Sequence, residues 1–214
     1  KKNGMGILNY PNGTKYEGEW VDGNREGSGV FVYSNGDKYN GNWYSDKRHG
    51  SGRLEYSNGN IYSGNWEDGM INGYGTIKIA GGDNYKGEWQ KGKKFGEGVY
   101  TYSNGEVYEG EWVNDKRQGN GIIFYVDGNK YDGEWKNNNR TGKGKLTFIN
   151  GDVYEGMFLN GELNGQGIFR YVNGEKYEGE WINSQRNGNG FFKYTNGEKY
   201  NGEWKNNKRN GRGV

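Results

Sequence analysis

The feature that most constrains this chain is a sequence repeat with a fixed period of 23 residues. The pattern Tyr-x-Gly-x-Trp begins at Tyr16, Tyr39, Tyr62, Tyr85, Tyr108, Tyr131, Tyr154, Tyr177 and Tyr200. Tryptophan fills the fifth position in eight of these repeats, and Phe158 fills it in the other one. Such a repeat predicts an array of small stacked units, because one 23-residue unit buries too little surface to fold alone.

Each unit is predicted to contain two short strands. Tyr16, Gly18 and Trp20 recur at period two and therefore share one face of the first strand. Gly29 and Phe31 share one face of the second strand, and the position of Phe31 is apolar in every copy. Asn-Gly and Asp-Gly pairs fit tight hairpin turns. With 43 glycines in 214 residues, long helices are disfavoured, and a ribbon of stacked hairpins is expected.

The register divides the chain unevenly at its two ends. Residues 1–15 read as the C-terminal half of a preceding repeat plus its turn, and residues 16–214 as nine tandem repeats, the last of them incomplete. The first half of the opening repeat is absent. We therefore expect a piece of a longer array at the N-terminal side, whereas the C-terminus fits a native end and a cut end equally.

Composition excludes several classes of site. The absence of cysteine removes disulfides, thiolate nucleophiles and cysteine-based metal sites. His49 is the single histidine and reads as a solvated turn residue, so neither a metal nor a cofactor is expected. The formal net charge of +2 disfavours a nucleic-acid partner, since nucleic-acid-binding domains are strongly basic. No segment approaches the ~18 apolar residues of a membrane span, so any membrane contact is expected to be peripheral.

The unit Tyr-Glu-Gly-Glu-Trp, followed seven residues later by Gly-x-Gly, resembles the MORN repeat (membrane occupation and recognition nexus) over essentially the whole chain. The resemblance implies an all-β fold: an elongated antiparallel β-hairpin solenoid with a single curved sheet. It also implies a non-catalytic cytoplasmic scaffold that self-associates and organises protein partners at membrane-associated cytoskeleton. A long array without another domain is most similar to the cytoskeletal MORN scaffold of apicomplexan parasites, which implies a role in budding and cytokinesis.

Basic residues recur near the turn between the two strands of a unit. They are Arg25, Lys47, Arg48, Lys93, Lys94, Lys116, Arg117, Arg140, Arg186, Lys208 and Arg209. Stacking of the repeats would align them along one edge. This edge is a candidate site for anionic phospholipid or for an acidic protein partner. The alternative is a solvated edge that keeps the sheet soluble.

Two repeats lack this basic pattern and carry apolar residues in its place. Met70 and Ile71 occupy the positions in one repeat, and Leu163 follows Glu162 in the other. Exposed apolar residues at turns indicate a partner site, and neutral variation within a tolerant turn explains them equally well.

The last repeat is the candidate site of self-association. It stops at Val214, which leaves Tyr200 and Trp204 with less cover and a strand edge unpaired. Unpaired edges of repeat arrays are templates for association. We therefore expect a homodimer or higher oligomer through the C-terminal repeats.

Overall fold

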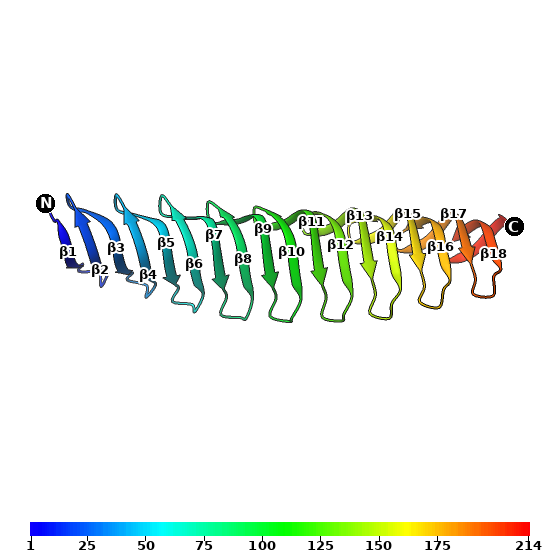
Figure 1. Cartoon of the computed structure of the whole chain (residues 1–214), viewed down its shortest axis with the longest axis horizontal. Coiled ribbons are helices and arrows are strands. Elements are labelled where there is room, and N and C mark those ends of the chain that lie inside the picture. The colour runs from blue at the N-terminus through cyan, green and yellow to red at the C-terminus, as the bar shows by residue number, and fades with distance from the viewer. The chain divides into compact units, whose positions relative to one another are not determined.

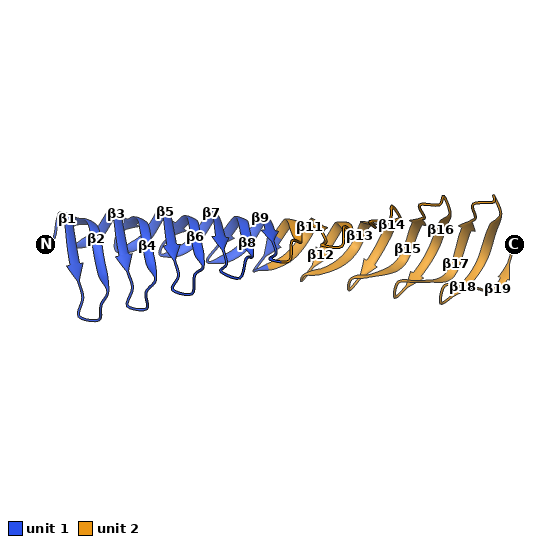
Figure 2. Ribbon diagram, turned by 90° about the horizontal axis from the view of Figure 1, so that it is seen from below, with its two compact units in different colours: residues 1–103, 112–115 blue, residues 104–111, 116–214 orange.

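The computed structural model describes all 214 residues, and it consists of strands, turns and loops (Figure 1). The chain divides into two compact units, which are coloured separately in Figure 2. Unit 1 comprises residues 1–103 and 112–115, and unit 2 comprises residues 104–111 and 116–214. No helix in the structure has the length and hydropathy needed to cross a lipid bilayer.

Unit 1 contains the first nine strands and the end of the tenth. The strands are β1 (Gly4–Asn9), β2 (Lys15–Val21), β3 (Asn24–Val32), β4 (Lys38–Tyr44), β5 (Lys47–Glu55), β6 (Ile61–Glu67), β7 (Met70–Lys78), β8 (Asn84–Gln90), β9 (Lys93–Thr101) and β10 (Val107–Val113). Consecutive strands pair antiparallel from β1 to β9.

Unit 2 holds most of β10 and the remaining nine strands. These are β11 (Lys116–Phe124), β12 (Lys130–Lys136), β13 (Asn139–Thr147), β14 (Val153–Leu159), β15 (Glu162–Arg170), β16 (Lys176–Ile182), β17 (Gln185–Lys193), β18 (Lys199–Lys205) and β19 (Lys208–Gly213). The 19 strands belong to one antiparallel sheet that does not close. The prediction of an all-β fold built from hairpins is therefore confirmed.

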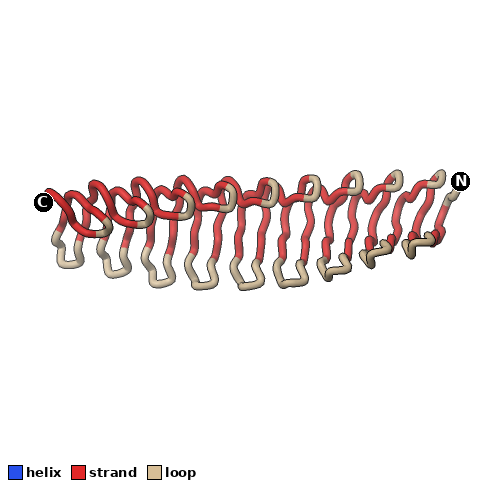
Figure 3. The backbone as a smooth tube through the Cα atoms, turned by 180° about the vertical axis from the view of Figure 1, so that it is seen from behind, coloured by secondary structure: helices blue, strands red, loops and turns tan.

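Each hairpin is closed at one end by a short turn and joined to the next hairpin by a longer loop, as the tan segments of Figure 3 show. Asp22 and Gly23 form a short turn, and both have positive φ angles, of 51° and 92°. Positive φ at both central residues gives the turn that matches the twist of paired strands. The five-residue loop after β3 is closed by the Tyr33 N–H, which donates to the Asp37 carbonyl at 2.9 Å. We call these the short turns and the long loops.

Successive repeats are also tied together at both ends of their strands. The Asp46 N–H in one short turn donates to the Arg25 carbonyl of the preceding repeat at 3.1 Å. Between long loops, the Ser57 N–H donates to the Asp37 carboxylate at 2.7 Å. Similar bonds recur at 23-residue intervals, with Asn or Asp oxygens as the acceptors at the long loops. This bonding explains part of the chain's high content of asparagine and aspartate.

The core lies on one face of the sheet, which we call the aromatic face and define by Tyr16, Trp20, Phe31 and their counterparts at intervals of 23 residues. The first eight repeat tyrosines are fully buried. Gly18 pairs with Gly29 across the hairpin, and Tyr16 lies against Gly29 so closely that an added Cβ would meet the phenol oxygen. The predicted assignment of these residues to one buried face is confirmed.

Candidate functional site

Aromatic rings form a continuous ladder within each unit. The Tyr16 ring lies edge-on to Trp20 of its own repeat at 5.0 Å between centroids, and to Trp43 of the next repeat at 5.5 Å. Edge-to-face pairs of this geometry stabilise beyond the area that they bury. The Trp43 indole N–H donates to the Gly29 carbonyl at 3.2 Å, so each repeat is joined to its predecessor by ring contact and by hydrogen bond.

A basic side chain covers this ladder in most repeats. We call the position of Arg25 and its counterparts at 23-residue intervals the capping position. The Arg25 guanidinium lies 4.3 Å from the Trp43 ring centroid and donates to the Asp46 carbonyl at 2.8 Å. Arg48, Lys94, Arg117, Arg140 and Arg186 lie over the Trp or Phe ring of the following repeat in the same way.

The structure therefore divides the basic residues that the sequence assigned to one edge. Arg25, Arg48, Lys94, Arg117 and Arg209 lie against aromatic rings. Lys47, Lys93, Lys116 and Lys208 are exposed, one residue away in the same strands. The alternation of side chains along a strand could have separated the two sets. Arg25 is an even number of residues from Gly29 and Phe31 and therefore lies on the same face of the sheet as they do. The expectation of a single basic edge is corrected to two sets of residues on opposite sides.

Two repeats have an aliphatic residue at the capping position, namely Ile71 in unit 1 and Leu163 in unit 2. Each of these residues borders a cavity on the aromatic face, which we call the Ile71 recess and the Leu163 recess. An aliphatic side chain reaches less far than arginine and makes no bond to the next turn. Trp181 stays buried next to Leu163, whereas Phe169 is more exposed than its counterpart Phe31, which is buried in a repeat with arginine at the capping position.

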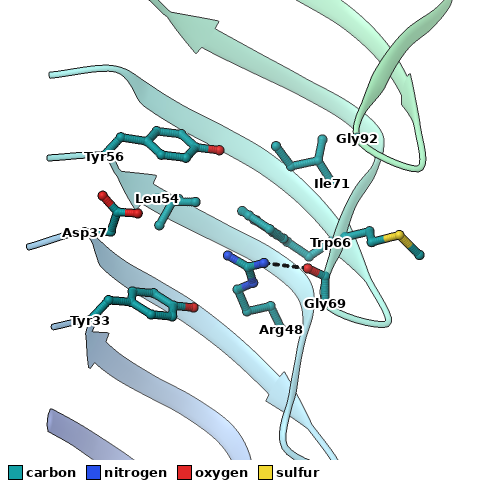
Figure 4. A pocket seen from close by; sticks show the side chains of 10 residues that line it. Tyr33, Asp37, Arg48, Leu54, Tyr56, Trp66, Gly69, Ile71 and Gly92 are labelled. Carbon is teal, nitrogen blue, oxygen red and sulfur yellow. Dashed lines mark hydrogen bonds between the residues drawn. The ribbon is translucent and has the colours of Figure 1, made fainter. Parts of the chain in front are cut away.

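The Ile71 recess has a volume of about 380 Å³. Figure 4 shows the Arg48 guanidinium beside the Trp66 ring, with its hydrogen bond to the Gly69 carbonyl, and the hydroxyls of Tyr33 and Tyr56 directed into the cavity. Burial raises the pKa of Tyr56, so its hydroxyl stays protonated at neutral pH. The recess thus combines an apolar floor with phenol and guanidinium donors at its sides.

The Leu163 recess is the larger one, at about 490 Å³. Its apolar lining includes Phe148, Phe169 and Trp181, and two arginines, Arg140 and Arg186, also border it. This arrangement can hold an apolar side chain of another molecule and can donate hydrogen bonds to polar groups beside it.

The predicted apolar patch differs in part from what the sequence suggested. Met70 is 46% exposed, as expected for a patch at a turn. Ile71 and Leu163 are only 9% and 7% exposed, because the capping position faces the aromatic rings and not solvent. The expectation that all three are exposed is therefore wrong for Ile71 and Leu163, which instead form walls of recesses.

The C-terminal residues proposed for self-association differ in their cover. Trp204 is buried beneath Phe192 and Arg186, so its expected exposure is wrong. Tyr200 is partly exposed, and Val214 is almost fully exposed although its backbone pairs with Asn201.

His49 contacts only the Tyr44 ring among aromatic side chains, and no group of three or more metal-ligating side chains lies together anywhere in the structure.

One structural role was missed entirely in the sequence. The pairing of β2 with β3 shifts register between Gly18 and Glu19, which marks a β-bulge. The Glu19 carboxylate accepts the Ser28 N–H at 2.9 Å. Glu111, Glu134 and Glu180 do the same in their repeats. Glutamate recurs at this position, and that was the available signal in the sequence. Without knowledge of the bulge, these glutamates are assigned to the solvent-exposed face of the sheet.

Comparison with known proteins decides the family. The MORN repeat profile matches ten consecutive segments that span the chain: residues 1–15, 16–38, 39–61, 62–84, 85–107, 108–130, 131–153, 154–176, 177–199 and 200–214. The chain belongs to the MORN repeat family. A comparison with curated protein sequences found no match.

Solved structures resemble the MORN array in fold. The TCP10 domain of Danio rerio CPAP, solved in complex with a STIL peptide, matches with a TM-score of 0.55 at 14% identity and covers 95% of this chain and 91% of that one. The TCP domain of Drosophila melanogaster SAS-4, in complex with a proline-rich motif of Ana2, has a TM-score of 0.48 at 14% identity, with coverage of 83% and 90%. At these identities the likeness concerns the fold alone.

Proposed function

We propose that this MORN array is a non-catalytic scaffold that binds segments of partner proteins on its aromatic face. The observation that carries the proposal is the pair of recesses bordered by Ile71 and Leu163, whose linings combine aromatic side chains with arginine. Aromatic side chains and arginine are the residue types that dominate the energetics of protein interfaces. The CPAP domain of similar fold was solved with a bound peptide of its partner, which supports the same mode here.

The wider role that we propose is to hold partners in line at membrane-associated cytoskeleton, with the budding and cytokinesis apparatus as its site of action. Self-association through Tyr200 and Val214 would extend such a scaffold. The support for this role is the run of ten MORN repeat matches along residues 1–214, since a long array offers many places for partners in a row.

Photocrosslinking in the cells that make the protein tests the binding face. The photoreactive residue p-benzoylphenylalanine would replace Tyr56 or Tyr171, which line the two recesses, or Glu109 or Glu178, which are exposed on the other face. We expect discrete crosslinked partner proteins from the first pair only. Equal crosslinking from both faces, or none from the recesses, would contradict the proposal.

A peripheral phospholipid-binding module is the second candidate function. The observation in its favour is that four repeats carry an exposed lysine at the same position of the unit, namely Lys47, Lys93, Lys116 and Lys208. Sedimentation with anionic vesicles tests it, since binding through lysines must fall steeply with salt. Binding that is absent at low salt would eliminate this candidate.

A further inference from the structure

We propose that the Leu163 recess binds an apolar side chain of an extended partner segment that carries a carboxylate on each side of that residue. This rests on the proposed function and names the chemistry of the partner at one site. Three features of unit 2 carry it: the shape of the recess, the charge beside it and the apolar residues of the adjoining loops.

The shape follows from one substitution in the repeat pattern. Leu163 stands where six other repeats carry a lysine or arginine over the following Trp or Phe ring. No cation lies over Trp181, whose ring instead contacts Tyr154, Tyr177 and Phe169. Trp181 and the more exposed Phe169 line the recess, so an incoming side chain can lie against these rings where other repeats hold their own arginine.

The charge beside the recess is positive and unpaired. The ion pairs of the chain's arginines involve Arg25, Arg53 and Arg170, and neither Arg140 nor Arg186 has a carboxylate partner. Each of these two donates one side-chain hydrogen bond, to a backbone carbonyl in the next short turn. A guanidinium has five N–H donors, so both retain donors for a bound carboxylate.

The surrounding residues do not neutralise these arginines. The short-turn residues bonded to Arg117, Arg140, Leu163 and Arg186 are uncharged: Asn138, Gly161, Ser184 and Asn207. Glu162 is exposed and does not line the recess. Asp152 and Glu175 act on Tyr171 from the long-loop end, where Asp152 already accepts the Val172 N–H.

The recess at the other aliphatic capping residue, Ile71, differs in both lining and charge. Asp37 lines the Ile71 recess together with Arg48. Lys94, the counterpart of Arg186, is attracted by Asp115 and Asp83. A partner with flanking carboxylates therefore meets two guanidinium groups without ion pairs at Leu163, whereas at Ile71 it meets the Asp37 carboxylate and a lysine that already has acidic neighbours.

The long loops beside the Leu163 recess add apolar surface. Phe148 and Tyr171 line the recess, and the residues that follow them, Ile149 and Val172, are 73% and 69% exposed. The same loop positions in unit 1 hold Ser57 and Ala80. Isolated exposed apolar residues are common, but two neighbouring ones at the mouth of an apolar recess extend one binding surface.

The repeat spacing sets the spacing of the partner's residues. Two strands at ~4.8 Å each separate successive repeats by roughly 10 Å. Arg140 and Arg186 lie one repeat before and one repeat after Leu163. An extended chain rises ~3.3 Å per residue, so the two carboxylates are expected about three residues before and after the apolar residue.

The test uses capped heptapeptides of defined sequence and the intact chain. The probe is Glu-Gly-Ser-Phe-Ser-Gly-Glu, and two comparison peptides carry Lys in place of both Glu or Gly in place of Phe. Titration followed by the indole N–H signals in two-dimensional NMR reports binding at each tryptophan separately. We expect the Trp181 signal to shift with the Glu–Phe probe, and at least about tenfold weaker binding of both comparison peptides.

Leu163→Arg supplies the decisive variant, because it restores the capping residue that neighbouring repeats carry and therefore preserves the fold. It adds positive charge while filling the recess. We expect loss of the Trp181 shift, whereas Leu159→Arg, the same exchange at an exposed position on the other face, keeps it. Arg140→Gln and Arg186→Gln are each expected to weaken binding of the Glu–Phe probe selectively.

The outcomes separate this inference from the proposed function. Unchanged or stronger binding by the Leu163→Arg chain, or equal binding of the Glu and Lys peptides, overturns the inference. A probe that shifts Trp89 and is lost with Ile71→Arg also overturns it, but leaves partner binding on the aromatic face intact. If the photocrosslinking experiment finds no partner on that face either, both fail.

Discussion

The guanidinium carbon of Arg48 lies 4.1 Å from the centroid of the Trp66 ring, one repeat further along the chain. Its terminal nitrogen donates to the Gly69 carbonyl at 2.6 Å, so one side chain joins the ring ladder and the next short turn. The residue at this position thus has a structural role in most repeats, and where Ile71 and Leu163 replace it they border a recess.

Arg48→Met is expected to lower the free energy of unfolding by about 1–2 kcal/mol, because it keeps the apolar stem but removes the cation over Trp66 and the bond to Gly69. Urea unfolding followed by tryptophan fluorescence measures the loss. Arg53→Met is the matched control, since Arg53 lies in the same strand but pairs only with Glu55 at the surface. Its effect should stay within roughly 0.5 kcal/mol. Equal losses in the two variants would contradict the capping role.

Gly29→Ala is expected to destabilise the protein by about 1–3 kcal/mol, because its Cβ would overlap the Tyr16 hydroxyl oxygen. Gly81→Ala is the control, since no atom lies within 4 Å of a Cβ there and its φ is not positive. That exchange should leave the stability unchanged or raise it slightly. The comparison of urea midpoints checks the difference, and similar midpoints would show that the ring can move away from Gly29.

The two-strand unit and its buried face could be predicted from the sequence because both follow from local alternation. Tyr16, Trp20 and Phe31 recur at period two, and Asp22-Gly23 marks the turn between them. The side of the sheet on which Arg25 lies was also available from its parity with Phe31. It was missed because a charged residue near a turn is usually assigned to solvent, whereas stacking on a ring lets a guanidinium lie half-buried.

The bulge and the recesses could not be predicted in the same way. The bulge at Glu19 depends on a bond to the Ser28 backbone on the neighbouring strand, which no single-strand pattern reports. The recesses depend on how far a capping side chain reaches across to the next repeat. The substitutions at Ile71 and Leu163 were visible in the sequence, but their meaning required the contact that they replace.

Stability is expected to fall as pH rises through the alkaline range. Burial raises the pKa of Tyr16 and of Tyr177 from 10 to about 12, so the fold favours the neutral phenol. The stabilisation is complete below pH 10, where the unfolded tyrosine is also protonated, and is lost as pH rises from 10 towards 12. Urea midpoints at pH 8, 10 and 11, with tyrosinate absorbance as the readout of ionisation, check this. A midpoint that does not change up to pH 11 would contradict it.

The asparagine at the second short-turn position is expected to act through both its backbone and its side chain. Asn138 has a φ of 72°, and its side-chain oxygen accepts the Arg117 N–H at 2.8 Å. Asn138→Gly removes only this side-chain hydrogen bond, and it is expected to lower the free energy of unfolding by about 0.5–1.5 kcal/mol. Asn138→Ala loses the bond and also strains the backbone, so it should cost about 1 kcal/mol more. Chemical unfolding of both variants tests the order, and an Ala variant as stable as the Gly variant would refute the backbone contribution.

Self-association through the last repeat is the remaining prediction. The other eight repeat tyrosines also contact the Trp or Phe of the following repeat, whereas the Tyr200 ring contacts Trp204 of its own repeat. A second chain that covers Tyr200 would supply the missing contact. Light scattering is expected to give twice the chain mass of 24.3 kDa, and Tyr200→Asp is expected to return it to the single-chain value.

Tyr44→Asp is the control for this experiment, because Tyr44 is exposed on a strand of unit 1 and should not alter the mass. Since a dimer dissociates on dilution, the measurement should cover a hundredfold range of concentration. A single-chain mass throughout that range would refute association through Tyr200.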